Sequence, residues 1–217
     1  MKQTYYGNRE KCYQCYRPKS SCMCQYFHKI KTTTKFVILM HPKEFKKVKN
    51  NTGHFTHQSL PNSELFVGID FTNHKRINEI IQTHQSYILY PSEDALNIST
   101  TVPPQSQQPL AIFLIDATWA CAKPIFYRST NLAKLPHMSF SATRNSAYEI
   151  KIQPQDGYLS TIESAQEVLY ALAKHKIENI TKEEIESFLE PFYKMIAYQK
   201  ELIANPKSHA VRFKRRR

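Results

Sequence analysis

The segment from Leu110 to Trp119, LAIFLIDATW, is the feature that most constrains the fold. Its six consecutive apolar residues end abruptly at Asp116, which is soon followed by the only tryptophan of the sequence. A short apolar run with β-branched and aromatic members is typical of a strand buried on both faces of a parallel sheet. Such a strand presents Asp116 at its carboxyl end, where open α/β sheets bind ligands. The alternative is that Asp116 caps the following helix, and this segment alone favours that interpretation.

Other short apolar runs alternate with helical stretches. This alternation predicts an α/β fold with a mainly parallel sheet and flanking helices. The predicted strands cover residues 36–40, 65–69, 87–90 and 110–115, with shorter ones at 138–140 and 148–152, and the predicted helices cover about 73–84 and 118–127. Pro124 should kink or shorten the second of these helices. The polar, proline-rich stretch from Ser99 to Pro109 predicts a surface linker within the domain.

Two further helix starts carry the residue pattern of a capping box. Ser160 precedes Glu163 by three residues, and Thr181 precedes Glu184 by the same spacing. We expect the second pair to begin the last long helix of the chain, which Pro191 should kink.

The glycine content argues against two classes of nucleotide-binding protein. The sequence holds only four glycines, and no two of them are close together. Neither the glycine-rich dinucleotide-binding turn nor the phosphate-binding loop of NTPases can be built from them. The sequence therefore argues against a Rossmann-type cofactor domain and against an NTPase.

Four of the five cysteines lie in one short window, as Cys12-x-x-Cys15 and Cys22-x-Cys24. The polar N-terminus resembles no export signal, so this spacing favours tetrahedral thiolate binding of a structural zinc ion over disulfides. A redox role or chance clustering is the alternative. Cys121 stands alone and is expected to be a small buried hydrophobic residue.

Positive charge dominates the chain. Lysine and arginine number 30 against 18 acidic residues, which gives a formal net charge of +12 and a pI of about 9.4. This excess favours a polyanionic partner, with nucleic acid as the first expectation. The cations gather in a helical turn, 43–49, which is either a solvated face or a phosphate ligand, and in the basic tail that ends at Arg217. Gly53 follows that turn and is expected to end it.

The longest apolar run is far shorter than the ~18 residues that a membrane-spanning helix requires. We therefore expect a soluble, cytoplasmic protein with no membrane partner and no obligate protein partner.

Six motifs occur in an order and spacing that resemble the DTW-domain family. The resemblance runs from about Cys12 to Ala173. The motifs are the cysteine set, His41-Pro-x-Glu44, Asn51-Thr-Gly53, Pro91-Ser-x-Asp94-Ala95, Asp116-x-Thr118-Trp119 and Leu159-Ser-Thr-x-Glu163. Position 117 is alanine where the family frequently has glycine, and Glu149 and Lys151 stand where relatives often carry arginines.

The resemblance implies a tRNA-uridine aminocarboxypropyltransferase that depends on S-adenosylmethionine. Such enzymes transfer the 3-amino-3-carboxypropyl group to N3 of a uridine and release methylthioadenosine. The implied fold is SPOUT-like, with a trefoil knot around the cofactor in its C-terminal part. The implied organisation is a zinc-binding module at 1–30, a catalytic domain at 31–205 and a basic tail at 206–217.

The resemblance, together with the excess of positive charge for the tRNA contacts, gives candidate site residues. Asp116 is the catalytic candidate, because a carboxylate can accept the proton of uridine N3 or hold the cofactor's ammonium group. The loops expected around S-adenosylmethionine contribute Tyr90, Pro91, Ser92, Ile115, Asp116, Thr118, Leu159, Ser160 and Thr161. The residues expected to contact the tRNA are His41, Lys43, Glu44, Lys46, Lys47, Lys49, Asn51, Thr52, Trp119, Arg144, Arg212 and Arg215.

Several alternatives stay open at the level of sequence. Trp119 either stacks on a base or faces the core, and Ser160 and Glu163 are fully explained by a capping box. The chain could instead be an RNA methyltransferase that uses the same cofactor, or a non-catalytic, zinc-containing RNA-binding protein.

Overall fold

The structure is a computed structural model, and it describes residues 10–15, 17–46, 51–147 and 159–205. Within these residues the chain forms one six-stranded sheet in the order β2-β1-β5-β3-β6-β4, and every strand pair is parallel. The strands are β1 Lys35–Met40, β2 Ser63–Val67, β3 Gln85–Leu89, β4 Leu96–Asn97, β5 Leu110–Asp116 and β6 His137–Ser139. The predicted parallel α/β sheet is confirmed.

The position of strands β1 and β5 inside the sheet explains why their sequences are almost wholly apolar. Each pairs with a neighbour on both sides and is buried on both faces of the sheet. Successive side chains then point into different cores, as Phe36 and Val37 do. The short strand β4 was not predicted, and the segment predicted at 148–152 lies outside the described residues.

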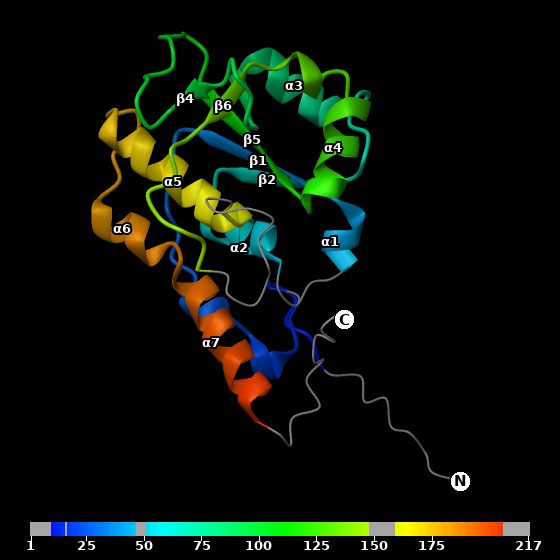
Figure 1. The fold of residues 1–217 in the computed structure, drawn as a ribbon, viewed down its shortest axis with the longest axis vertical. Helices are drawn as coiled ribbons and strands as arrows, with labels where there is room; N and C mark the ends of the chain where they lie inside the picture. Colours follow the sequence, from blue (N-terminus) through cyan, green and yellow to red (C-terminus); the bar gives the residue numbers. More distant parts are fainter. Residues whose placement is uncertain (1–9, 16, 47–50, 148–158, 206–217) are drawn as a thin grey trace.

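Helices cover both faces of the sheet (Figure 1). One face packs against α2, Thr52–Ser59, and α5, Thr161–Lys174, with α6, Lys182–Ser187, and α7, Glu190–Ala204, beyond them. The other face packs against α3, Lys75–Thr83, and α4, Trp119–Arg128. The short helix α1, Pro42–Lys46, follows β1 directly. The fold is therefore a three-layer sandwich with one apolar core on each side of the sheet.

The helix starts confirm the two capping boxes but correct the prediction of one long, kinked last helix. Both boxes are present, at Ser160 of α5 and at Thr181 of α6. Pro191 does not kink a long helix, because the expected helix is divided into α6 and α7 and the proline lies in the first turn of α7. A proline is tolerated there because the N–H groups of a first turn have no partner within the helix. Pro124 lies inside α4 and does not shorten it, because the helix continues to Arg128, and the expected kink stays a prediction.

The prediction that Gly53 ends a helix is wrong. Asn51 is the N-cap of α2, and Gly53 lies in the first turn of that helix. The glycine is required by a close neighbour, described below. Cys121 is half-buried instead of buried, because α4 turns Ala122, Ile125 and Phe126 toward the core.

The implied trefoil knot depends on the path of the chain between β6 and α5. Residues 148–158 of that path lie outside the described residues, so the knot stays a prediction. None of the helices in the described part of the chain is both long and apolar enough to span a membrane.

Candidate active site

A crevice is expected where the chain leaves adjacent parallel strands in opposite directions. After β1 the chain continues through α1 and α2 to β2, on one side of the sheet. After β5, which is the neighbour of β1, it continues through α4 to β6, on the other side. Met40 and Asp116 are register partners at this divergence, so Asp116 lies at the topological switch point where open α/β sheets bind ligands.

The carboxylate of Asp116 is buried, with a relative exposure of 5%, and both of its oxygens accept hydrogen bonds. Thr161 donates its hydroxyl to Oδ1 over 2.7 Å, and Asn51 donates its side-chain amide to Oδ2 over 2.9 Å. The N-cap of α4 is Thr118, so the helix after β5 does not begin at Asp116. Asp116 instead joins the start of α2 to the start of α5.

Asn51 orients its amide toward Asp116 because its oxygen is already engaged. The Oδ1 atom accepts the backbone N–H of His54 over 2.9 Å, as expected of an N-cap residue. Nδ2 is thereby turned toward Asp116 and lies 3.6 Å from the sulfur of Met40. One side chain thus both starts α2 and fixes the carboxylate.

Gly53 allows the first turn of α2 to approach the same carboxylate. A Cβ atom at this position would lie 2.6 Å from both Cγ and Oδ2 of Asp116. That separation is far below a van der Waals contact, so only glycine fits without movement of the neighbour. Sequence reasoning missed this role because the conflicting atom belongs to a residue far away along the chain.

Two helix N-termini, those of α2 and α5, which carry partial positive charge, lie beside the carboxylate of Asp116. The nearby imidazoles are neutral near pH 7: burial lowers the pKa of His54 to about 4, and burial followed by the charge of Lys43 lowers the pKa of His41. The Nδ1 atom of His41 accepts the N–H of Lys43, which fits an unprotonated nitrogen.

Glu163 holds the start of α5 in place. Its carboxylate is fully buried and accepts hydrogen bonds from the N–H and hydroxyl of Ser160, the hydroxyl of Ser146 and the N–H of Ala147, at 2.6–2.8 Å. The capping box is therefore also a clamp on the segment that follows β6. It positions Thr161, the hydroxyl donor to Asp116.

An aromatic wall lies beside the ends of β3, β5 and β6. Tyr90 stacks on Phe126 with ring centroids 4.8 Å apart and an interplanar angle of 7°, and its ring centroid lies 6.2 Å from that of Trp119. His137 packs edge-on against Tyr90 and shares a 2.7 Å hydrogen bond with the hydroxyl of Ser92. Trp119 is half-buried, so its ring belongs partly to this wall and partly to the surface.

The structure brings several predicted site residues to the carboxyl edge of the sheet. The residues following β1, β3 and β5 and those starting α2 and α5 lie there, namely His41, Asn51, Thr52, Tyr90, Ile115, Asp116, Thr118, Ser160 and Thr161. Pro91 and Ser92 continue from β3 and are exposed, and Leu159 is half-buried.

Other predicted contacts lie elsewhere or outside the described residues. Glu44 is buried in α1, whereas Lys43 is exposed. Arg144 is half-buried and donates to Gln166 of α5 and Tyr193 of α7, so it links two helices instead of standing in an exposed turn. Five more lysines and arginines were predicted to contact tRNA. Lys46 is described only in its backbone, and Lys47, Lys49, Arg212 and Arg215 lie outside the described residues.

The four clustered cysteines fit a tetrahedral metal site. All four sulfurs lie within 4.8 Å of one another, with Cys12 3.6 Å from Cys24 and Cys15 3.8 Å from Cys22. Four thiolates around zinc, each bonded at about 2.3 Å, are separated by about 3.8 Å. The backbone N–H groups of Cys15 and Gln14 lower the pKa of Cys12 to about 6, whereas burial raises the pKa of Cys22 and of Cys24, so a bound metal cation would be needed to hold all four cysteines as thiolates.

The cysteine module packs directly on α2. Arg17 is almost fully buried, donates from Nε to the carbonyl of Ser21 over 2.7 Å, and its guanidinium lies 6.0 Å from the ring centroid of Phe55 in α2. Met23 belongs to the same apolar core as Phe55. The module therefore supports the helix whose first turn holds Asp116.

Comparison with known proteins identifies the family of the chain. The sequence pattern of the DTW domain matches residues 9–200, which include every residue of the site described above. The chain belongs to the DTW-domain family.

Curated relatives of this DTW protein are named tRNA-uridine aminocarboxypropyltransferase 2. The one from Drosophila melanogaster is 33% identical over 173 residues, which cover 76% of the chain and 68% of the relative. Those from Mus musculus and Macaca fascicularis are 29% and 27% identical, and each match covers 88% of the chain and 64% of the relative. The chain thus spans about two thirds of the length of these relatives. No solved structure matches it.

Proposed function

We propose that this DTW protein transfers the 3-amino-3-carboxypropyl group of S-adenosylmethionine to N3 of a uridine in tRNA and releases methylthioadenosine. The observation that carries the proposal is the buried carboxylate of Asp116, held by Asn51 and Thr161 at the switch point of the sheet. The names of the relatives support the same chemistry and the tRNA substrate.

The reaction requires one bond to form and one to break. Uridine N3 loses its proton and bonds to the carbon next to the sulfonium, while that carbon releases the sulfur with its bonding electrons. Asp116 acts either by accepting the N3 proton or by holding the ammonium group of the transferred moiety. Both roles require a fixed carboxylate, which the donors from α2 and α5 supply. Fixing two reactants in attack geometry contributes up to ~7–11 kcal/mol to lowering the barrier.

The remaining assignments follow from this proposal. The segments 90–92, 115–118 and 159–161 would surround S-adenosylmethionine, and the zinc ion would be structural. The zinc module at 1–30, the lysines at 43–49 and the tail at 206–217 would contact tRNA next to the catalytic domain at 31–205. The protein would act in solution in the cytoplasm.

Nucleoside mass spectrometry of tRNA, after incubation with the protein and labelled S-adenosylmethionine, tests the proposal. The expected product is a uridine that has gained the mass of the aminocarboxypropyl group. A gain of a methyl group would identify an RNA methyltransferase instead, and unmodified tRNA would leave a non-catalytic RNA-binding protein.

The role of Asp116 is tested by Asp116→Asn, with Glu183→Gln as the control. Glu183 is an exposed acid in α6, so its substitution makes the same change from carboxylate to amide away from the carboxylate held by α2 and α5. Asp116→Asn should abolish modification while thermal unfolding and tRNA binding without cofactor stay close to wild type. Full activity of Asp116→Asn would refute an essential carboxylate.

A further inference from the structure

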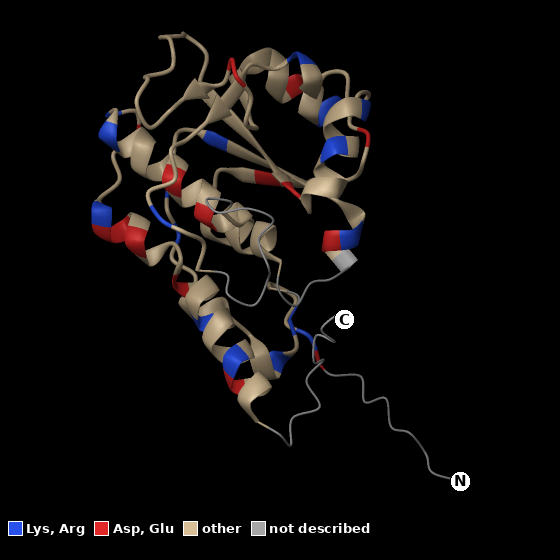
Figure 2. Cartoon of the chain, in the orientation of Figure 1, with Lys and Arg blue, Asp and Glu red and all other residues tan. Residues whose placement is uncertain are grey.

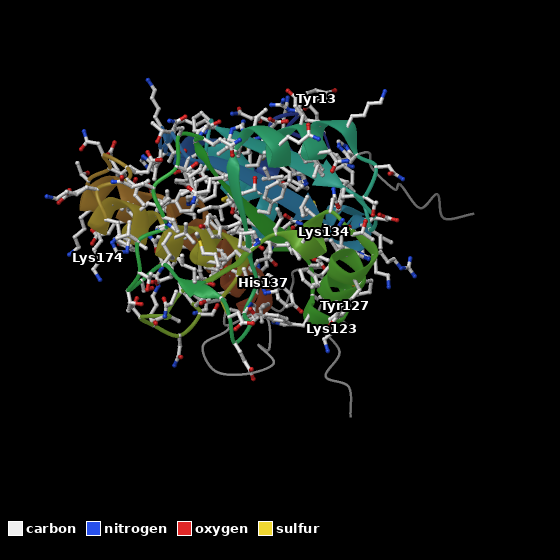
Figure 3. All side chains as sticks on the ribbon, turned by 90° about the horizontal axis from the view of Figure 1, so that it is seen from above. Tyr13, Lys123, Tyr127, Lys134, His137 and Lys174 are labelled. Atoms are coloured by element: carbon white, nitrogen blue, oxygen red, sulfur yellow. The ribbon has the colours of Figure 1, made fainter. Side chains whose placement is uncertain are left out.

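The outward face of α4 and of the following 3-10 helix η4, Leu132–Lys134, carries exposed cations around an exposed aromatic ring. Lys123, Arg128 and Lys134 are exposed, and Tyr127 has a relative exposure of 72%. Figure 3 shows Lys123, Tyr127 and Lys134 on one side of the molecule, far from Lys174. We call these four residues, Lys123, Tyr127, Arg128 and Lys134, the α4 surface.

Tyr127 is exposed although the rest of the helix is well packed. Ala122, Ile125 and Phe126 face the core, so α4 has a conventional buried side and Tyr127 lies opposite it. Its ring packs edge-on against Phe126, with ring centroids 5.6 Å apart, so the aromatic ring is held on the helix while most of its surface stays open to a ligand.

The charge of the α4 surface is of one sign. Between Asp116 and Glu149 the sequence contains no acidic residue, and Figure 2 shows blue but no red on α4. The acid that faces this surface is Asp70, whose pKa is lowered first by hydrogen bonds from Thr72 and, to a smaller extent, by the charge of Arg128. Arg128 therefore has an acidic neighbour, whereas Lys123 and Lys134 form no ion pair within the described residues.

The α4 surface leads away from the candidate active site. Trp119 begins α4 three residues after Asp116, and Lys123 and Tyr127 follow it at intervals of four residues. Residues four apart lie on one face of a helix, about 6 Å from one another along its axis. An aromatic ring, a cation and a second aromatic ring are thus arranged in one stripe that starts beside the buried carboxylate.

We propose that the α4 surface binds the RNA strand next to the target uridine, with Lys123 and Lys134 on phosphates and Tyr127 stacked on an unpaired base. The inference rests on the proposed tRNA-modifying function and deepens it. Cations that follow the backbone and an aromatic ring that accepts any base are the two elements of single-strand recognition. An acidic protein partner would match the charge but would leave the exposed ring without its counterpart.

The test measures the affinity of the full-length protein for total tRNA at several salt concentrations. Lys123→Glu combined with Lys134→Glu should weaken binding by about tenfold or more and make the slope of log affinity against log salt shallower by about 0.7–0.9 for each lysine. Tyr127→Ala should weaken binding about tenfold, whereas Tyr127→Phe, which keeps the ring, should bind like wild type. Lys182→Glu in α6 makes the same charge change on an exposed lysine outside the α4 surface and should have little effect.

Turnover separates this inference from the proposed function. Lys123→Gln combined with Lys134→Gln, which adds no negative charge, should raise the KM for tRNA and leave kcat unchanged, with an unchanged unfolding temperature. If wild-type protein modifies tRNA and the α4 variants bind tRNA as tightly as wild type, the inference about the α4 surface is overturned and the proposed function is kept. Wild-type protein that neither binds nor modifies tRNA would overturn both. A change in oligomeric state of the variants without RNA would assign the α4 surface to a protein contact and refute the RNA assignment.

Discussion

The substitution Asn51→Asp should make the stability of the protein depend on pH in a defined way. Aspartate is as good an N-cap as asparagine, so the hydrogen bond from the His54 N–H is kept. The amide donor to Asp116, 2.9 Å away, is replaced by a carboxyl group of the same shape. When one of the two carboxyl groups is protonated it can donate the missing hydrogen bond, and when both are ionised they repel each other.

The size of the effect follows from the separation. Two unit charges about 4 Å apart, at an effective dielectric constant of about 20, repel by about 4 kcal/mol, which equals about 3 pKa units. One carboxyl pKa of the folded variant is thus raised from about 4 to about 7. A raised folded-state pKa gives stability that is present below the unfolded-state pKa and is lost as pH rises through the folded-state pKa. The variant should therefore lose about 1.5 kcal/mol by about pH 5 and about 4 kcal/mol by about pH 8.5.

Urea unfolding of wild type and variant between about pH 5 and 8.5 measures this difference directly. Asn51→Ser is the control, because serine keeps a capping oxygen and adds no charge, so its loss of about 1–3 kcal/mol should not vary with pH. Parallel pH profiles for Asn51→Asp and wild type would refute the contact between Asn51 and Asp116, and with it the geometry of the candidate active site.

Two further changes probe the neighbours of this carboxylate. Gly53→Ala should leave the free energy of unfolding within about 2 kcal/mol of wild type, because the better helix propensity of alanine offsets part of the clash with Asp116. The displaced carboxylate should slow tRNA modification about a hundredfold. A stable variant that modifies tRNA as fast as wild type would contradict the close approach of Gly53 to Asp116. Chelation, or Cys15→Ser, should remove bound zinc and lower the unfolding temperature by about 10 °C, as a loss of about 3–4 kcal/mol does for a domain of this size. The control Cys121→Ser should change neither the zinc content nor the unfolding temperature. Metal-free protein that unfolds at the wild-type temperature would show that the cysteine module is not a structural metal site.

The sequence predicted the elements whose causes are local. The apolar runs that became β1 and β5 need burial on two faces, and this requirement is visible in their composition. The capping boxes of α5 and α6 and the spacing of the four cysteines involve residues close together in the chain, so they too could be recognised. Family motifs then selected Asp116 over the capping interpretation that its own segment favours.

The prediction for Gly53 was wrong because the residue that requires a glycine there is distant in the sequence. Glycine is common at helix ends, but a glycine is needed at position 53 because the carboxylate of Asp116 lies beside it. Only the packing of α2 on β5 brings the two residues together. The error at Pro191 has a local origin, because the helix is interrupted between α6 and α7 just before this proline, which lies in the first turn of α7. A short sequence motif does not predict which distant segment will pack against it.

The sequence by itself determined that Asp116 ends a buried strand, since hydrophobic periodicity and chain-neighbour chemistry are properties of a segment. Only the tertiary structure decided what surrounds that acid. Asn51 and Thr161 lie 65 and 45 residues away from it, and they reach it because a parallel sheet gathers the carboxyl ends of its strands, and the helix starts beside them, at one edge. The strand order that creates this edge is fixed by packing between segments distant in the sequence.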